Sequence, residues 1–262
     1  MSDPHRPRKR FSQNFLIDEG AIGRIVAAIA PRAGDAMVEI GPGLGAITRP
    51  LARIVQPLHV VEIDRDIVAR LAREFPAKEV VMHEGDALAF DFAALGPALR
   101  VVGNLPYHIS TPLLFHLADC TPALCDIHVM LQDEVVERMV AEPGSSVYGR
   151  LSVMLQYRFE MEKVLDVPPA AFNPPPKVDS AVVRMIPRGA DLQRARDERL
   201  FAETVLAAFS QRRKTLRNTL GSRLSAADFA ALGIDPQARA QTLAVEDFVR
   251  IADYRSGQRS ER

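Results

Sequence analysis

The sequence has no tryptophan and only two cysteines, Cys120 and Cys125, among its 262 residues. A single cysteine pair leaves a zinc site incomplete, so we expect two reduced thiols and no metal ion. No apolar run is long enough to cross a bilayer, and the basic N-terminus lacks the apolar segment of a secretory signal. These absences argue against a disulfide-stabilised secreted protein and against a membrane protein, and they predict a cytoplasmic protein.

The formal net charge is zero as well, because 33 basic residues balance 33 acidic ones. That balance argues against a nucleic-acid partner, but the basic residues are unevenly distributed. One group lies near the N-terminus and a second lies in an acid-free stretch near the other end: Arg6, Arg8, Lys9 and Arg10, and Arg212, Arg213, Lys214, Arg217 and Arg223. Charge clusters are often only solvated surface, yet two separated basic clusters on a neutral protein are also typical of phosphate binding.

Apolar runs of strand length alternate with helical periodicity over the first half of the chain. Strands are predicted at 36–40, 60–63, 80–83, 100–103 and 127–132, with helices between most of them. This alternation predicts an α/β fold, a mostly parallel Rossmann-like sheet with helices on both faces. We expect Asp18 to cap the first helix, and Thr111 to cap a later helix that has Pro112 at its first position.

The composition of the chain changes near residue 187. Before it, two further strands at about 159–167 and 179–187 flank a proline-rich loop. After it, a short linker leads to helical patterns at about 198–210, 213–220, 226–232 and 245–252. The sequence therefore predicts two domains, residues 1–187 with the sheet and the basic tail, and residues 188–262 as a small all-helical domain.

A glycine-rich turn follows the first predicted strand of the sheet. The segment Glu39–Ala46 reads EIGPGLGA and satisfies the pattern G-x-G-x-x-A. Glu62 ends the next strand 19 residues after Gly43, which is the distance at which an acidic side chain reaches a ribose diol. Asp86 follows the third strand and is placed to accept a hydrogen bond from an adenine amino group, although a turn aspartate is an equally good interpretation. NAD and S-adenosylmethionine both fit these residues.

The fourth predicted strand ends in Asn104–Leu105–Pro106–Tyr107. Ligands of open α/β sheets bind beyond the carboxyl ends of the strands, so this turn lies where chemistry is expected. Pro106 restricts its own backbone and that of Leu105, which holds the carboxamide and the phenol in fixed relative positions. An amide beside an aromatic ring suits a flat heterocycle with an exocyclic amine. An ordinary strand-to-helix turn is the alternative.

The loop between the last two strands, 172–180, contains the consecutive prolines Pro174, Pro175 and Pro176. These prolines stiffen the loop, and we predict that it holds Phe172 out on a rigid arm. The alternative is a hairpin connection with Phe172 in the core.

Taken together, these stretches resemble the ribosomal RNA adenine N6,N6-dimethyltransferases of the small-subunit, 16S type. The matching stretches follow one another over nearly the whole chain: 11–16 (FSQNFL), 39–45, 61–64, 85–87, 104–107, 172–180 and 209–220 (FSQRRKTLRNTL). The resemblance implies a methyltransferase sheet whose cofactor, S-adenosylmethionine, is contacted by residues matching Asn14, Leu16, Gly41, Glu62, Asp86 and Asn104. To these we add their neighbours Gln13, Gly43, Ile63 and Ala87 as predicted cofactor contacts.

The resemblance also implies dimethylation of two adjacent adenosines in a hairpin near the 3′ end of 16S rRNA. The partner is then 16S rRNA within a small ribosomal subunit or its precursor, and we expect a monomer. The predicted RNA-binding residues are Arg8, Lys9, Arg10, Lys177, Arg212, Arg213, Lys214 and Arg217.

The residues themselves predict how an adenine amine would react. Its lone pair is delocalised into the ring, so it is a poor nucleophile. The Asn104 side-chain oxygen and the Leu105 carbonyl would accept hydrogen bonds from the N6–H groups and so favour a more pyramidal nitrogen. We predict that the extruded base stacks on Tyr107, with Phe172 closing its other face.

Three other functions are compatible with parts of the sequence. The related 23S rRNA adenine dimethyltransferases of the antibiotic-resistance type share the fold, but the loop at 172–180 and the stretch at 209–220 favour the small-subunit enzyme. An NAD-dependent oxidoreductase fits the glycine pattern, but no His–Asp or Tyr–Lys pair for hydride transfer is evident. A non-catalytic ribosome-assembly factor would not need the motifs that are retained here.

Overall fold

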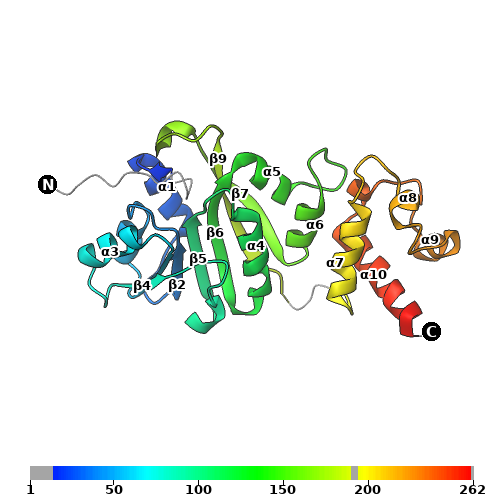
Figure 1. The fold of residues 1–262 in the computed structure, drawn as a ribbon, viewed down its shortest axis with the longest axis horizontal. Helices are drawn as coiled ribbons and strands as arrows, with labels where there is room; N and C mark the ends of the chain where they lie inside the picture. The colour runs from blue at the N-terminus through cyan, green and yellow to red at the C-terminus, as the bar shows by residue number, and fades with distance from the viewer. Residues whose placement is uncertain (1–13, 190–193, 261–262) are drawn as a thin grey trace. The chain divides into compact units, whose positions relative to one another are not determined.

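The computed structural model describes residues 14–189 and 194–260. The chain forms two compact units (Figure 1). Of the described residues, the first unit contains those up to 136 together with 160–187, and the second contains 137–159 and those from 188 onward. The segment 137–159 therefore differs from the predicted division at residue 187, because Tyr148, Val153 and Tyr157 share a buried core with the C-terminal helices.

The first unit is built on a seven-stranded sheet with the order β4-β3-β2-β5-β6-β9-β7. Its strands are β2 (Met37–Ile40), β3 (Leu58–Glu62), β4 (Val80–Glu84), β5 (Leu99–Asn104), β6 (Leu124–Gln132), β7 (Phe159–Val167) and β9 (Ser180–Pro187). The first five strands in this order, from β4 through β3, β2 and β5 to β6, pair in parallel. Strand β9 is antiparallel to β6. The predicted mostly parallel α/β sheet is confirmed, and the antiparallel β9 makes it a mixed sheet.

The central strands are buried on both sides because they consist largely of β-branched and aliphatic residues. Val38, Val60, Val101, Val102 and Val129 have at most traces of exposed surface. Parallel strands place all their carboxyl ends at one edge of the sheet. Glu39, Glu62 and Asn104 are therefore brought together although they are far apart in sequence.

The helices of this unit connect the strands. They are α1 (Glu19–Ile29), α2 (Thr48–Ala52), α3 (Arg65–Glu74) and α4 (Ser110–Asp119), with a 3-10 turn η2 (Phe92–Leu95). The helix α5 (Asp133–Val140) begins in this unit, and its residues from Glu137 onward belong to the second unit. The Asp18 side chain accepts a hydrogen bond from the Ala21 N–H, so the predicted cap of the first helix is confirmed. The helix after the glycine turn, α2, is short and ends at Ala52.

The predicted start of α4 is wrong by two residues. The helix begins at Ser110, with Ile109 in the capping position, and Thr111 lies inside it. The cause is the preceding turn: the Ile109 N–H donates to the Pro106 carbonyl at 3.1 Å, and the Ser110 hydroxyl donates to the Tyr107 carbonyl at 2.9 Å. Helical geometry therefore starts before Thr111 can act as a cap.

A second, two-stranded sheet joins distant parts of the first unit. Strand β1 (Phe15–Leu16) pairs antiparallel with β8 (Phe172–Asn173), so that Leu16 lies opposite Phe172. Next to this pair, the Ile17 N–H donates to the Ala171 carbonyl at 2.8 Å. The proline-rich loop is thereby attached to the segment that precedes α1.

The second unit is all-helical. It contains α6 (Arg150–Gln156), α7 (Glu198–Ala208), α8 (Leu216–Leu220), α9 (Ala226–Leu232), the 3-10 turn η5 (Ala240–Thr242) and α10 (Val245–Ser260). Its core contains stacked rings of Tyr157 and Phe201, whose centroids are 4.2 Å apart, and the buried rings of Phe229 and Phe248. In the described part of the chain, none of the helices has the length and apolar character needed to span a membrane.

Two predicted helices of this unit have different bounds. The helix expected at 245–252 continues to Ser260. The helix expected at 213–220 starts only at Leu216, because Thr215 is extended and forms a bridge with Arg239. Arg212, Arg213 and Lys214 consequently lie in the turn between α7 and α8.

Candidate active site

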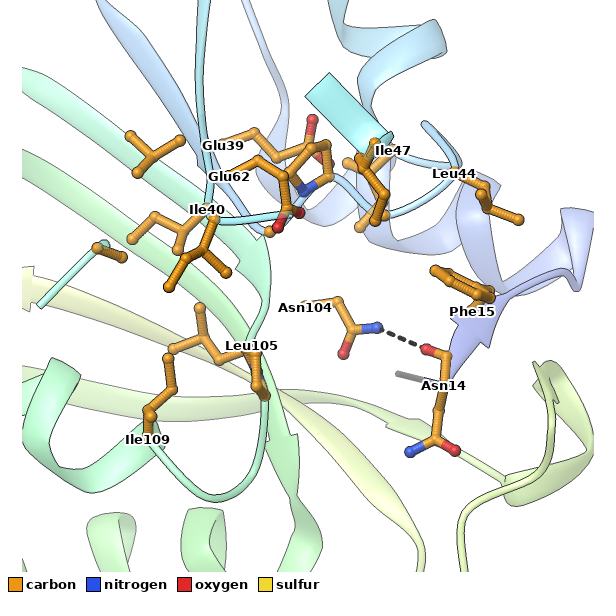
Figure 2. Close-up of a pocket in the computed structure, with 18 of the residues that line it drawn as sticks. Asn14, Phe15, Glu39, Ile40, Leu44, Ile47, Glu62, Asn104, Leu105 and Ile109 are labelled. Carbon is orange, nitrogen blue, oxygen red and sulfur yellow. Dashed lines mark hydrogen bonds between the residues drawn. The ribbon is translucent and has the colours of Figure 1, made fainter. Parts of the chain in front are cut away.

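A cavity of about 310 Å³ lies at the carboxyl ends of β2, β3 and β5. Its size is at the lower end of the range for ligand-binding pockets. Figure 2 shows Glu39, Glu62 and Asn104 around this space, with Phe15 and Asn14 at one end. Predicted site residues form much of its lining: Asn14, Leu16, Gly41, Gly43, Glu62, Ile63, Asp86, Ala87, Asn104, Leu105 and Tyr107. Gln13 lies outside the described residues.

The glycines of the turn after β2 keep this cavity open. Gly41 and Gly43 have φ angles of +67° and +55°, which only glycine adopts readily. A Cβ atom on Gly43 would stand 3.1 Å from the Phe15 ring. Gly103 is needed for a different reason, because a Cβ atom there would lie 2.4 Å from the Ile40 carbonyl oxygen on the neighbouring strand. The backbone is therefore accessible to a ligand, as the glycine pattern predicted.

Glu62 supplies a carboxylate at the end of β3. Its side chain is 9 % exposed, and its Oε1 atom accepts a hydrogen bond from the Asp64 N–H at 2.8 Å. Burial raises the pKa of Glu62, while the backbone N–H groups of Asp64 and Ile63 oppose that shift. A held carboxylate in an apolar cavity is the group expected to receive the two hydroxyls of a ribose.

The part of the cavity that lies beyond β3 and β4, at Ile63 and Ala87, suits a planar, mostly apolar group. Ile63 is 49 % exposed and lines the cavity together with the buried Ala87. The Asp86 Oδ1 atom accepts the Leu88 N–H at 2.9 Å, so the same carboxylate also acts as the turn residue that the sequence allowed. A diol acceptor, an open glycine turn and an apolar slot together fit the ribose and base of an adenosine cofactor.

Glu39 is a second buried carboxyl group in this cavity, and it was not among the predicted site residues. Its Oε2 atom accepts a hydrogen bond from the Thr48 hydroxyl at 2.6 Å. Burial raises its pKa from 4.5 to about 7, the Thr48 hydroxyl opposes the shift, and the nearby charge of Glu62 adds to it. Its position two residues before Gly41 was the only signal available in the sequence.

The carboxamide of Asn104 is oriented by a backbone contact. Its Nδ2 atom donates to the Asn14 carbonyl oxygen at 3.3 Å, as Figure 2 shows. The donor end of the amide is therefore turned toward β1, and the acceptor oxygen is available on the other side. The following residue is fixed as well, because the Leu105 N–H donates to the Met130 carbonyl of β6 at 3.1 Å.

Tyr107 stands at the same turn with its ring half-buried against the cavity. Its hydroxyl lies 2.7 Å from Ser180 Oγ, at the first residue of β9. Burial raises the pKa of Tyr107, and the Ser180 hydroxyl opposes that shift. The phenol is consequently neutral at physiological pH, and its position is determined by the proline-rich loop that ends at Ser180.

The predicted placement of Phe172 is wrong. The ring is 3 % exposed and belongs to the buried cluster that contains Leu16, Val167 and Ala171. The pairing of β8 with β1 turns this side chain inward, and the cavity described above does not include it among its lining residues. In this arrangement Phe172 supports the site from the core.

The described residues predicted to bind RNA are exposed in both units. Lys177 lies in the proline-rich loop of the first unit. Arg212, Arg213, Lys214 and Arg217 lie in the second unit, where the bridge between Thr215 and Arg239 brings a further exposed arginine beside them. Arg239 was not predicted, because 22 residues separate it from Arg217. Arg8, Lys9 and Arg10 lie outside the described residues.

The strand order, the antiparallel β9 and the cavity with its Asn-Leu-Pro-Tyr turn define an S-adenosylmethionine-dependent methyltransferase. Solved structures agree. The chain is similar to a dimethyladenosine transferase from Plasmodium falciparum, with a TM-score of 0.79 and 26 % identity over 90 % of this chain and 95 % of that one. It is also similar to the 23S rRNA methyltransferase ErmE, with a TM-score of 0.73 and 25 % identity over 93 % and 100 % of the two chains.

Sequence comparison is more specific. The family model described as ribosomal RNA adenine dimethylase matches residues 4–256. The chain is 61 % identical to the ribosomal RNA small subunit methyltransferase A of Thiobacillus denitrificans, over 95 % of this chain and 98 % of the relative. It is 61 % identical to the protein of the same name from Nitrosospira multiformis, over 98 % and 99 %. The chain belongs to the ribosomal RNA adenine dimethylase family.

Proposed function

We propose that this enzyme dimethylates N6 of two adjacent adenosines in a hairpin near the 3′ end of 16S rRNA. The observation that carries the proposal is the turn Asn104–Tyr107, which places an amide acceptor and an aromatic ring at the edge of an adenosine-cofactor cavity. The small-subunit substrate is supported by the names of relatives that are 61 % identical over nearly their whole length.

The residues that would hold the cofactor are those of the cavity. Glu62 would accept the ribose hydroxyls, Ile63 and Ala87 would contact the base, and the turn at Gly41–Gly43 would lie against the amino-acid end. When bound, S-adenosylmethionine supplies an electrophilic methyl group.

Asn104 and Leu105 act on the target amine. In the first transfer the two N6–H groups donate hydrogen bonds to the Asn104 Oδ1 atom and the Leu105 carbonyl, and in the second transfer the one remaining N–H donates to one of these oxygens. These bonds localise the nitrogen lone pair and direct it into the cavity. Most of the acceleration then comes from positioning two reactants. The nitrogen becomes acidic once it is methylated, so its proton can pass to water without a dedicated base.

Tyr107 and the basic surfaces act on the RNA. A base inside a helix cannot reach the cavity, so the target adenosine is extruded and stacks on the Tyr107 ring. The basic turn of the second unit, defined as Arg212, Arg213 and Lys214, contacts the phosphate backbone together with Arg217 and Arg239. Because its substrate is ribosomal RNA, the enzyme works in the cytoplasm, and it acts as a monomer.

Tritiated methyl transfer to purified small ribosomal particles, followed by mapping of the modified positions, tests the proposal. We expect label at two adjacent adenosines of 16S rRNA with the wild-type protein. Asn104→Ala should lower the single-turnover rate far more than RNA affinity. Label in large-subunit RNA, or label at an isolated adenosine, would contradict the proposal.

A further inference from the structure

We infer, on the basis of the proposed function, that Ser180 is a positioning residue for methyl transfer, because its hydroxyl fixes the Tyr107 ring where the target adenine stacks. Ser180 itself does not line the cavity; its effect on the reaction passes through the phenol. The proline-rich loop then contributes to catalysis through its last residue rather than through Phe172.

Both partners of this contact are attached to the same strand. The turn that carries Tyr107 is tied to β6 by the hydrogen bond from the Leu105 N–H to the Met130 carbonyl. Ser180 lies opposite Gln132 of β6 in the antiparallel pair β6–β9. Directly after β6, at the first residue of α5, the Asp133 N–H donates to the Asp179 carbonyl at 3.0 Å. Backbone pairing therefore fixes the backbone of the Tyr107 turn relative to the backbone of Ser180.

The backbone at Tyr107 has independent support. The Ile109 N–H donates to the Pro106 carbonyl, and the Ser110 hydroxyl donates to the Tyr107 carbonyl. These bonds hold the main chain but leave the two side-chain torsions of the tyrosine undetermined. A hydrogen bond at the far end of the ring restrains both torsions. Ser180 is suited to this role because it is fully buried, so its hydroxyl does not exchange partners with bulk water.

The inference predicts a characteristic pattern of rates. Tyr107→Phe and Ser180→Ala each remove the same contact and should lower the single-turnover rate of methyl transfer by about tenfold or more. The double variant should be no slower than the slower single variant, because the contact can be lost only once. Ser180→Thr keeps the hydroxyl and should recover most of the rate. Affinity for S-adenosylmethionine should be unchanged in all of them.

Ser152→Ala is the matched control. Ser152 is also fully buried, but its hydroxyl donates to the Arg138 carbonyl in the second unit. This variant should lower the melting temperature without changing the rate per folded molecule. Comparing it with Ser180→Ala separates loss of a buried hydroxyl from loss of the Tyr107 contact.

The assay uses the full chain, small ribosomal particles and single-turnover conditions, with melting temperatures measured in parallel. Failure of the wild type to methylate the particles would contradict the proposed function itself. If the wild type is active, a normal rate for Tyr107→Phe or additive losses in the double variant would overturn the role of Ser180. Should Ser180→Ala not fold, Tyr107→Phe still decides, because its altered atom lies on the half-buried ring.

Discussion

Leu16 and Phe172 lie opposite each other in the antiparallel pair β1–β8, and both side chains are buried. This pairing joins the segment that presents Asn14 to the loop that presents Ser180. It places Phe172 in the core of the first unit, where its ring stabilises the arrangement of the site.

The first prediction follows from that burial. Phe172→Ala should reduce the free energy of unfolding by about 3–5 kcal/mol, the usual cost of removing a buried ring. Denaturant unfolding measures this loss. Val178→Ala is the control, since that side chain is in the same loop and 45 % exposed, and it should have little effect. An unchanged stability combined with slow methyl transfer would instead support direct stacking of Phe172 on the adenine.

The sequence was most informative where a side chain follows a strand directly. Glu62 and Asn104 could be placed at one edge of the sheet because parallel strands end together. The turn at 41–45 could be recognised because it contains three glycines, and all three adopt positive φ in the structure. The predicted position of Phe172 was wrong because consecutive prolines indicate a stiff loop but do not indicate that Phe172 pairs with β1 and points into the core. Ser180, Glu39 and Arg239 were missed because their roles depend on partners that are distant in sequence, Tyr107 for Ser180 and Thr215 for Arg239.

The second prediction concerns the cofactor. Glu62→Ala removes the carboxylate that would receive the ribose hydroxyls and should weaken S-adenosylmethionine binding by about 1.5–3 kcal/mol. Isothermal titration calorimetry measures this change. Glu84→Ala is a matched control, because Glu84 is paired with Glu62 across β3 and β4 but is exposed and bonded to Arg65. Equal affinities of wild type and Glu62→Ala, or tighter binding of NAD by the wild type, would contradict the assignment.

The third prediction is a pH dependence of stability. The pKa of Glu39 is about 7 in the folded protein and near its ordinary 4.5 when the chain is unfolded. The folded state therefore holds a proton that the unfolded state has lost between these two values, so this group lowers stability as the pH rises from about 4.5 to 7. The total effect is about 3 kcal/mol.

Glu39→Gln tests this sign. The groups acting on Glu39 are the Thr48 hydroxyl and the charges of Glu62 and Arg49, and none of them is altered by the substitution. The melting temperature of the variant minus that of the wild type should increase as the pH is raised from 5 to 8. A constant difference across that range would show that Glu39 titrates normally.

The last prediction concerns the basic turn of the second unit, Arg212, Arg213 and Lys214. All three side chains are exposed, and among the described residues none of them forms an ion pair. If they contact phosphates, binding releases counterions, and the logarithm of affinity falls with the logarithm of salt concentration by about 0.7–0.9 per contact. Replacing all three with glutamine should weaken binding to small ribosomal particles and flatten that slope by about two to three.

Arg239→Gln should flatten it further by up to about one. Arg199→Gln is the control for Arg239→Gln, because Arg199 is equally a surface arginine but pairs with Glu203 on α7. Filter binding at a series of salt concentrations gives the slopes, and calorimetry should show unchanged cofactor affinity. Coinciding slopes for the triple variant and the wild type would mean that the basic turn is only solvated surface, because neutralising a phosphate contact must change the number of counterions released.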